Sequence, residues 1–104
     1  MQSMNPQEDE DQLCALLKVL RTSLKTLSTH VLVTKPQWTA WERAWRAAHD
    51  GDVGRFERAI NDLDSLVHFH NHEALGLQGA QQYLRVRNLI RCIQDIWPYS
   101  FEPH

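Results

Sequence analysis

The sequence predicts an all-α protein, a small antiparallel helical bundle of about four helices built around a central helical hairpin. Three observations support this fold class. Apolar residues recur three and four residues apart through most of the chain, which is the helical period. Glycine, proline and capping residues divide this pattern into segments of helical length. The length of 104 residues suits one helical domain, residues 1–104.

The first helix is expected to begin at Pro6, within an acidic N-terminal segment of residues 1–11. Proline suits the first helical position because its missing N–H would have no partner there. The four acidic residues 8–11 favour the positive end of a helix. The apolar positions then form one narrow stripe: Leu13, Leu17, Leu20, Leu24, Leu27 and Val31. So short a heptad pattern favours a helix within the bundle, and a homodimer stays an open alternative.

The central hairpin is expected to span residues 34–66. Three tryptophans share one face of its first helix, at spacings of three and four residues: Trp38, Trp41 and Trp45. Gly51 suits the end of this helix and Asp52 can cap the next. A connection of two residues makes the two helices antiparallel neighbours.

The third helix is expected to continue to about Asn71, with His70 as the last member of its apolar stripe. Gly76 and Gly79 then indicate a short loop or a frayed turn. A fourth helix follows and is expected to stop at Pro98, leaving an aromatic C-terminal tail, residues 98–104, that covers the end of the bundle. Seven residues are predicted to be the most deeply buried: Leu20, Leu24, Phe56, Ile60, Leu63, Ile90 and Ile93.

Composition excludes several classes of protein. No apolar run approaches the roughly 20 residues that span a bilayer, so no membrane association is expected. The polar, acidic N-terminus does not resemble a signal or transit peptide. The two cysteines form no ligand or disulfide motif, which favours reduced thiols and a cytoplasmic location.

Catalytic signatures are absent from the sequence. There is no glycine-rich phosphate loop, no GxSxG motif and no Cys-His or Ser-His pair in a helpful context, so we expect neither enzymatic activity nor a cofactor. Nucleic-acid binding is also judged unlikely. Arg55 and Arg58 begin a helix after a tight turn, but Glu57, Asp62 and Asp64 on that helix would repel phosphates.

A histidine cluster gives the alternative hypothesis of a metal-binding bundle. On one continuous helix, Asp64, His68 and His72 would share a face, and two imidazoles four residues apart can bind one metal ion. The other predicted helices offer few matching ligands, so no metal is the preferred interpretation.

The leading hypothesis is a non-enzymatic module that binds another protein. A compact helical chain of mixed charge, rich in tryptophan and without a catalytic motif, is similar in type to small inhibitors, immunity proteins, antitoxins and phage counter-defence proteins. Exposed aromatic residues are typical anchors of such interfaces. The expected anchors are Trp38, Tyr99 and Phe101, with Lys35 and Glu102 as a polar rim.

Overall fold

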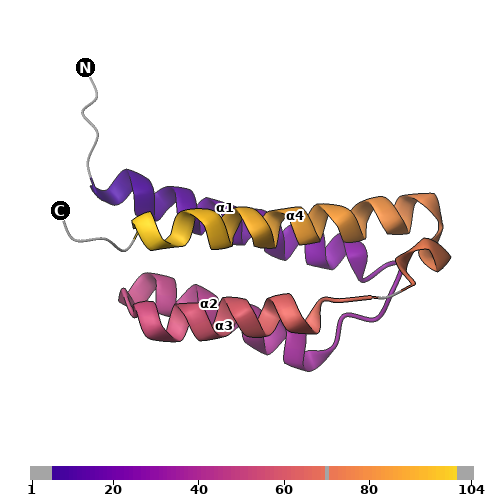
Figure 1. The fold of residues 1–104 in the computed structure, drawn as a ribbon, viewed down its shortest axis with the longest axis horizontal. Helices are drawn as coiled ribbons and strands as arrows, with labels where there is room; N and C mark the ends of the chain where they lie inside the picture. Colours follow the sequence, from indigo (N-terminus) through magenta and orange to yellow (C-terminus); the bar gives the residue numbers. More distant parts are fainter. Residues whose placement is uncertain (1–5, 70, 101–104) are drawn as a thin grey trace, which may run out of the picture.

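The computed structural model describes residues 6–69 and 71–100 of the chain, with side chains described from 12 to 98 within those ranges. This part of the chain forms four α-helices and one short 3₁₀ helix: α1 (Pro6–Leu27), α2 (Lys35–Asp50), α3 (Val53–Leu66), η1 (His72–Leu75) and α4 (Gly76–Ser100). The helices alternate in direction and pack as two layers, α1 beside α4 and α2 beside α3 (Figure 1). The predicted antiparallel bundle is confirmed.

The hydrophobic core draws on all four helices. The seven residues predicted to be most deeply buried have no exposed surface, which confirms the predicted phase of α1, α3 and α4. Helix α2 contributes mainly small residues, including Ala40, Ala44 and Ala47. Small side chains let α2 and α3 approach closely, and the tryptophan face of α2 is turned toward α1.

The turn between α2 and α3 has the predicted chemistry. Gly51 adopts a left-handed conformation with φ of 69°. This conformation favours glycine, because the Cβ atom of any other residue would lie too close to the backbone. The N–H of Asp52 donates to the carbonyl oxygen of Ala47 at 3.0 Å, as in a Schellman ending. A carboxylate oxygen of Asp52 accepts from the N–H of Arg55 at 3.1 Å and so caps α3.

The predicted end of the third helix at Asn71 is wrong, because α3 ends at Leu66. Side chains from other helices take the carbonyl oxygens that a further turn would have used. The amide of Gln37 donates to the carbonyl oxygen of Leu66 at 2.8 Å. The guanidinium of Arg87 donates to the carbonyl oxygens of Asp64 and Val67, both at 2.8 Å. His70 lies outside the described residues, so its predicted burial stays a prediction.

The predicted loop or frayed turn at Gly79 is also wrong, because this residue is buried within the first turn of α4. A Cβ at position 79 would lie 2.7 Å from the Cβ of Leu75 and 3.3 Å from the Cβ of His30. The segment that joins α1 to α2 therefore packs against the start of α4 at a point where only glycine fits. Here glycine serves close packing between segments that are distant in sequence.

The predicted end of α4 at Pro98 needs a correction as well. The helix continues to Ser100 and contains Pro98, so Tyr99 belongs to α4 and the predicted tail begins later. Proline cannot donate to the carbonyl oxygen four residues earlier and its ring crowds that carbonyl, but at this position both effects are confined to the last turns of α4. The side chain of Tyr99 is not described, and Phe101 and Glu102 lie outside the described residues.

Both connections between the two layers lie at the same end of the bundle. The segment from α1 to α2 and the segment from α3 to α4 are at this end, and the Gly51 turn is at the other (Figure 1). The N-terminal end of α1 and the C-terminal end of α4 lie near the Gly51 turn in the same view. The α2–α3 hairpin is thus joined covalently to the α1–α4 pair at one end only.

Candidate functional site: an aromatic groove between α1 and α2

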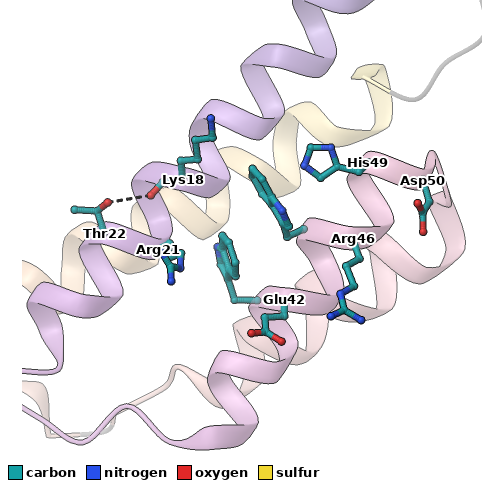
Figure 2. A pocket seen from close by; sticks show the side chains of 9 residues that line it. Lys18, Arg21, Thr22, Glu42, Arg46, His49 and Asp50 are labelled. Carbon is teal, nitrogen blue, oxygen red and sulfur yellow. Dashed lines mark hydrogen bonds between the residues drawn. The ribbon is translucent and has the colours of Figure 1, made fainter.

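A groove of about 890 Å³ lies along the surface where α1 meets α2 (Figure 2). We call it the aromatic groove. It is lined by Lys18, Arg21, Thr22, Trp41, Glu42, Trp45, Arg46, His49 and Asp50. Helix α1 supplies two cations and a hydroxyl group, and α2 supplies the aromatic rings and the carboxylates. The groove is therefore built by the basic flank of one helix and the aromatic face of the next.

The aromatic side chains of α2 form a continuous row because they are spaced four residues apart. The rings of Trp41 and Trp45 stack with centroids 5.4 Å apart and an angle of 14° between their planes. The imidazole of His49 meets the Trp45 ring edge-on, with centroids 4.4 Å apart. Exposure increases along this row, since Trp41 is buried, Trp45 is half-buried and His49 is exposed.

Trp41 is fixed in place by a hydrogen bond to α1. Its indole N–H donates to the carbonyl oxygen of Leu17 at 2.9 Å, in a buried position. A buried indole needs such a partner, because an unsatisfied N–H in the interior would cost free energy. Trp41 is thus a structural residue, and its stacked ring forms a rigid backing for the more exposed Trp45.

Two cations of α1 lie over these rings. The Nζ atom of Lys18 is 6.0 Å from the centroid of Trp45, and the Cζ atom of Arg21 is 5.6 Å from that of Trp41. These distances fall within the usual range for cation–π attraction. The hydroxyl of Thr22 donates to the carbonyl oxygen of Lys18 at 3.2 Å. Within the described residues, neither cation forms an ion pair with a carboxylate, so the α1 side of the groove presents net positive charge.

The predicted binding residues are distributed differently. Trp38 is half-buried and packs against the core, and Lys35 is exposed in a separate groove that also contains Pro36 and Leu66. The predicted partners Tyr99, Phe101 and Glu102 are not described at the level of side chains. The structure therefore does not test whether these residues form one surface, and the patch stays a prediction.

The sequence contained a signal for the aromatic groove that its interpretation did not use. The first helix carries a basic flank of Lys18, Arg21 and Lys25, and Trp45 belongs to the tryptophan face of the second. Only the packing of α1 on α2 shows that these two features meet.

The alternative metal site does not form as the sequence suggested. Its geometry required one helix through residues 64–72, but α3 ends at Leu66, before both histidines. The carboxylate of Asp64 forms an ion pair with Arg87 at 2.9 Å, and the ring of His72 stacks on Tyr83 at 5.0 Å between centroids. His68 is exposed in the segment after α3. Among the described residues, no three His, Cys, Asp or Glu side chains gather into a group that could hold a metal ion.

No protein-family model, curated protein or solved structure matches this chain. Within the ranges that the structure covers, no helix has the length and apolar character needed to cross a membrane.

Proposed function

We propose that this protein is a non-enzymatic binding module that uses the aromatic groove to dock an acidic segment of another protein. The half-buried ring of Trp45, framed by the cations of α1, is the observation that carries the proposal. Tryptophan and arginine are enriched among the residues that dominate protein interfaces. A tryptophan held by a stacked neighbour also loses little side-chain freedom on binding, which favours affinity.

Charge complementarity indicates the chemistry of the partner. Lys18, Arg21 and Arg46 outnumber the carboxylates of Glu42 and Asp50 that also line the groove, and none of these cations forms an ion pair with a described carboxylate. Carboxylates on a partner would supply the missing counter-charges and speed up the encounter. An apolar side chain between those carboxylates would rest on the ring of Trp45. The partner segment is thus acidic with an apolar centre.

The predicted patch near Trp38 extends this proposal. Trp38 lies seven residues before Trp45, two turns earlier on the same side of α2. A partner that lies along α2 would therefore reach Trp38 as well as Trp45, with Lys35 at its margin. Tyr99, Phe101 and Glu102 remain proposed contributors from the C-terminal end.

The biological role that suits such a module is inhibition by occlusion. A small helical protein that covers an acidic binding or active surface would act as an inhibitor, an immunity protein, an antitoxin or a phage counter-defence protein. A cytoplasmic location is part of the same proposal. It rests on the two cysteines, which form no metal-ligand or disulfide motif in the sequence.

Photo-crosslinking from inside the groove tests the proposal. A photoreactive phenylalanine analogue placed at His49 should capture one protein partner in stoichiometric yield. The same analogue at Asn88, an exposed position on α4, serves as the control. The double variant K18E/R21E should abolish capture from position 49, because it reverses both cations on the α1 side.

The melting temperature of K18E/R21E must stay close to that of the parent protein, since both residues are exposed. Equal capture from positions 49 and 88, or capture that survives the charge reversal, would exclude the aromatic groove as the docking site.

A further inference from the structure

A second groove, of about 490 Å³, lies between α2 and α3 and contains four exposed arginines. We call it the arginine groove. Its arginines are Arg43, Arg46, Arg55 and Arg58. Ala47 and Ala59 also line it, and Asp50 and Asp62 are its acidic members. Only Arg46 and Asp50 are shared with the aromatic groove.

The tight turn at Gly51 brings the four arginines to similar heights along the hairpin. Arg46 lies five residues before Gly51 (51 − 46) and Arg55 four residues after it (55 − 51). Arg43 lies eight residues before and Arg58 seven residues after (51 − 43, 58 − 51). At about 1.5 Å of rise per residue, the Cα atoms of all four arginines lie within a zone roughly 6 Å long, measured along the axis of the hairpin.

The two carboxylates lie outside this zone. By the same count, Asp50 is one residue from Gly51 and Asp62 is eleven residues from it (51 − 50, 62 − 51). They therefore lie at opposite ends of the groove, with the arginines between them. The positive charge is compact and bounded at both ends by negative charge.

The other acidic residues of α3 face away from this groove. Asp64 forms an ion pair with Arg87 of α4, and Asn61 accepts from the amide of Gln94 of α4 at 3.4 Å. Glu57 lies one turn before Asn61, on the side of α3 that faces α4. The carboxylates of Glu57 and Asp64 therefore do not point into the arginine groove, where they would repel a bound phosphate.

Internal ion pairs neutralise little of the arginine charge. Arg55 contacts Asp52 at 3.3 Å, but the Arg55 side chain is 75% exposed and that of Asp52 is 41% exposed. Such a surface pair contributes little free energy and exchanges readily for another anion. No described carboxylate forms an ion pair with Arg43, Arg46 or Arg58.

We propose that the arginine groove binds a short phosphate chain, such as the pyrophosphate or triphosphate part of a small molecule. Guanidinium groups hold phosphate oxygens through paired hydrogen bonds, and four of them can surround several phosphate groups at once. The acidic ends limit the length of the anion, which favours a short chain over a long polymer. The volume lies within the usual range for small-molecule sites.

The floor of the groove specifies how such a ligand is held. Ala47 and Ala59 leave room for phosphate groups to lie between the arginine rows. Among the residues that the structure describes, no aromatic side chain lines this groove, so a base or sugar attached to the phosphates would point toward solvent. Recognition therefore depends on the number of phosphates and little on what they carry. This binding goes beyond the proposed docking of a protein segment and does not depend on it.

Isothermal titration calorimetry with tripolyphosphate, pyrophosphate and orthophosphate tests this proposal at low ionic strength, with citrate as a carboxylate control. The site variant is R43Q/R55Q/R58Q. It leaves Arg46 and the rest of the aromatic groove unchanged. The matched control is K25Q/R85Q/R91Q, which removes the same charge from exposed positions elsewhere. Circular dichroism and the melting temperature establish that both variants fold.

Affinity should rise from orthophosphate to tripolyphosphate, and ATP should bind about as tightly as tripolyphosphate. The site variant should bind tripolyphosphate at least tenfold more weakly, and the control variant should change the affinity less than threefold. Three results would each overturn the proposal. They are no binding at millimolar tripolyphosphate, an equal loss in both variants, and citrate binding as tight as tripolyphosphate.

A fourth overturning result separates the short chain from a nucleic-acid strand. An oligonucleotide of about 16 nucleotides, the upper end of usual single-strand site sizes, is compared with tripolyphosphate in the same buffer. Tighter binding of the oligonucleotide, with a steep dependence on salt that the site variant reduces, would assign the groove to a strand backbone. Failure of any of these tests leaves the crosslinking test of the aromatic groove unaffected.

Discussion

The side chain of Gln37 donates a hydrogen bond to the backbone carbonyl oxygen of Leu66 at 2.8 Å. The same amide accepts from the N–H of Thr34 at 2.8 Å, so it serves the first turn of α2 and the last turn of α3 together. Gln37 is buried, which is unusual for an amide side chain and makes both bonds costly to lose. Gln37 thereby supplies hydrogen-bond partners to backbone groups at the start of α2 and at the end of α3.

Replacing Gln37 by Leu should therefore destabilise the protein by about 1–3 kcal/mol, because two backbone groups lose their partner. Replacing it by Glu keeps the acceptor and removes the donor. At neutral pH this change should be at least as harmful, because a carboxylate would face a carbonyl oxygen. Near pH 4 the introduced carboxyl group is partly protonated and can donate again, so its deficit relative to wild type should shrink. Urea unfolding at both pH values measures this, and a pH-independent deficit would argue against the bond to Leu66.

Gly79 and Gly54 should respond in opposite ways to alanine. A Cβ at Gly79 overlaps the Cβ of Leu75 at 2.7 Å, so G79A should lower stability by about 1–3 kcal/mol. A Cβ at Gly54 meets only a carboxylate oxygen of Asp52 at 3.9 Å, so G54A should raise stability by up to about 1 kcal/mol. Thermal unfolding of both variants checks the close packing at the start of α4. A neutral G79A would show that His30 and Leu75 do not press on this helix.

Arg87 should tolerate lysine poorly. Its guanidinium contacts two carbonyl oxygens and the carboxylate of Asp64, a geometry that an ammonium group cannot reproduce. R87K should cost about 1.5–3 kcal/mol, the range for hydrogen bonds to charged groups. D64N removes only a partly exposed ion pair and should cost about 1 kcal/mol or less. Hydrogen exchange should locate the loss at the end of α3. Equal costs for the two variants would mean that the ion pair, and not the capping of carbonyl oxygens, dominates.

The two stacked tryptophans should separate folding from binding. Trp41 is buried and bonded to Leu17, so W41A should destabilise the protein by about 3–5 kcal/mol. Trp45 is half-buried, so W45A should cost clearly less stability and weaken partner binding at least tenfold. Thermal melts measure the loss of stability, and titration with the purified partner identified by crosslinking measures the loss of binding. A W45A variant that binds normally would remove Trp45 from the interface.

Phe56 tests the phase of α3. Its ring is fully buried and lies 5.8 Å, centroid to centroid, from the ring of Trp97 in α4. F56A should cost about 3–5 kcal/mol. Val53, one turn earlier, is exposed, so V53A should cost less than about 1 kcal/mol. Urea unfolding of the pair checks this, and similar costs would contradict the orientation of the helix.

Apolar spacing was sufficient to predict the buried faces of α1, α3 and α4, because burial imposes the helical period on residues such as Leu24 and Ile60. Turn chemistry at Gly51 was equally readable, since it depends on neighbouring residues alone. The end of α3 could not be predicted from the sequence around it, because Gln37 of α2 and Arg87 of α4 bind its last carbonyl oxygens. The prediction for Gly79 failed for the same reason, since the lack of space for a Cβ atom at this position comes in part from His30, which is distant in sequence. The aromatic groove required knowledge of which flank of α1 faces Trp45, and no local pattern contains that information.

The single-ended attachment of the α2–α3 hairpin has a mechanical consequence. Both chain connections lie at the end opposite Gly51, so the two layers are covalently joined at that end and are held at the other by side-chain packing, such as Phe56 of α3 against Trp97 of α4 (Figure 1). Any opening that keeps the helices intact therefore has its hinge near Gly79 and its widest gap near Gly51. The aromatic groove bridges the layers, so an occupant seated between Lys18 and His49 would act as a latch on this hinge.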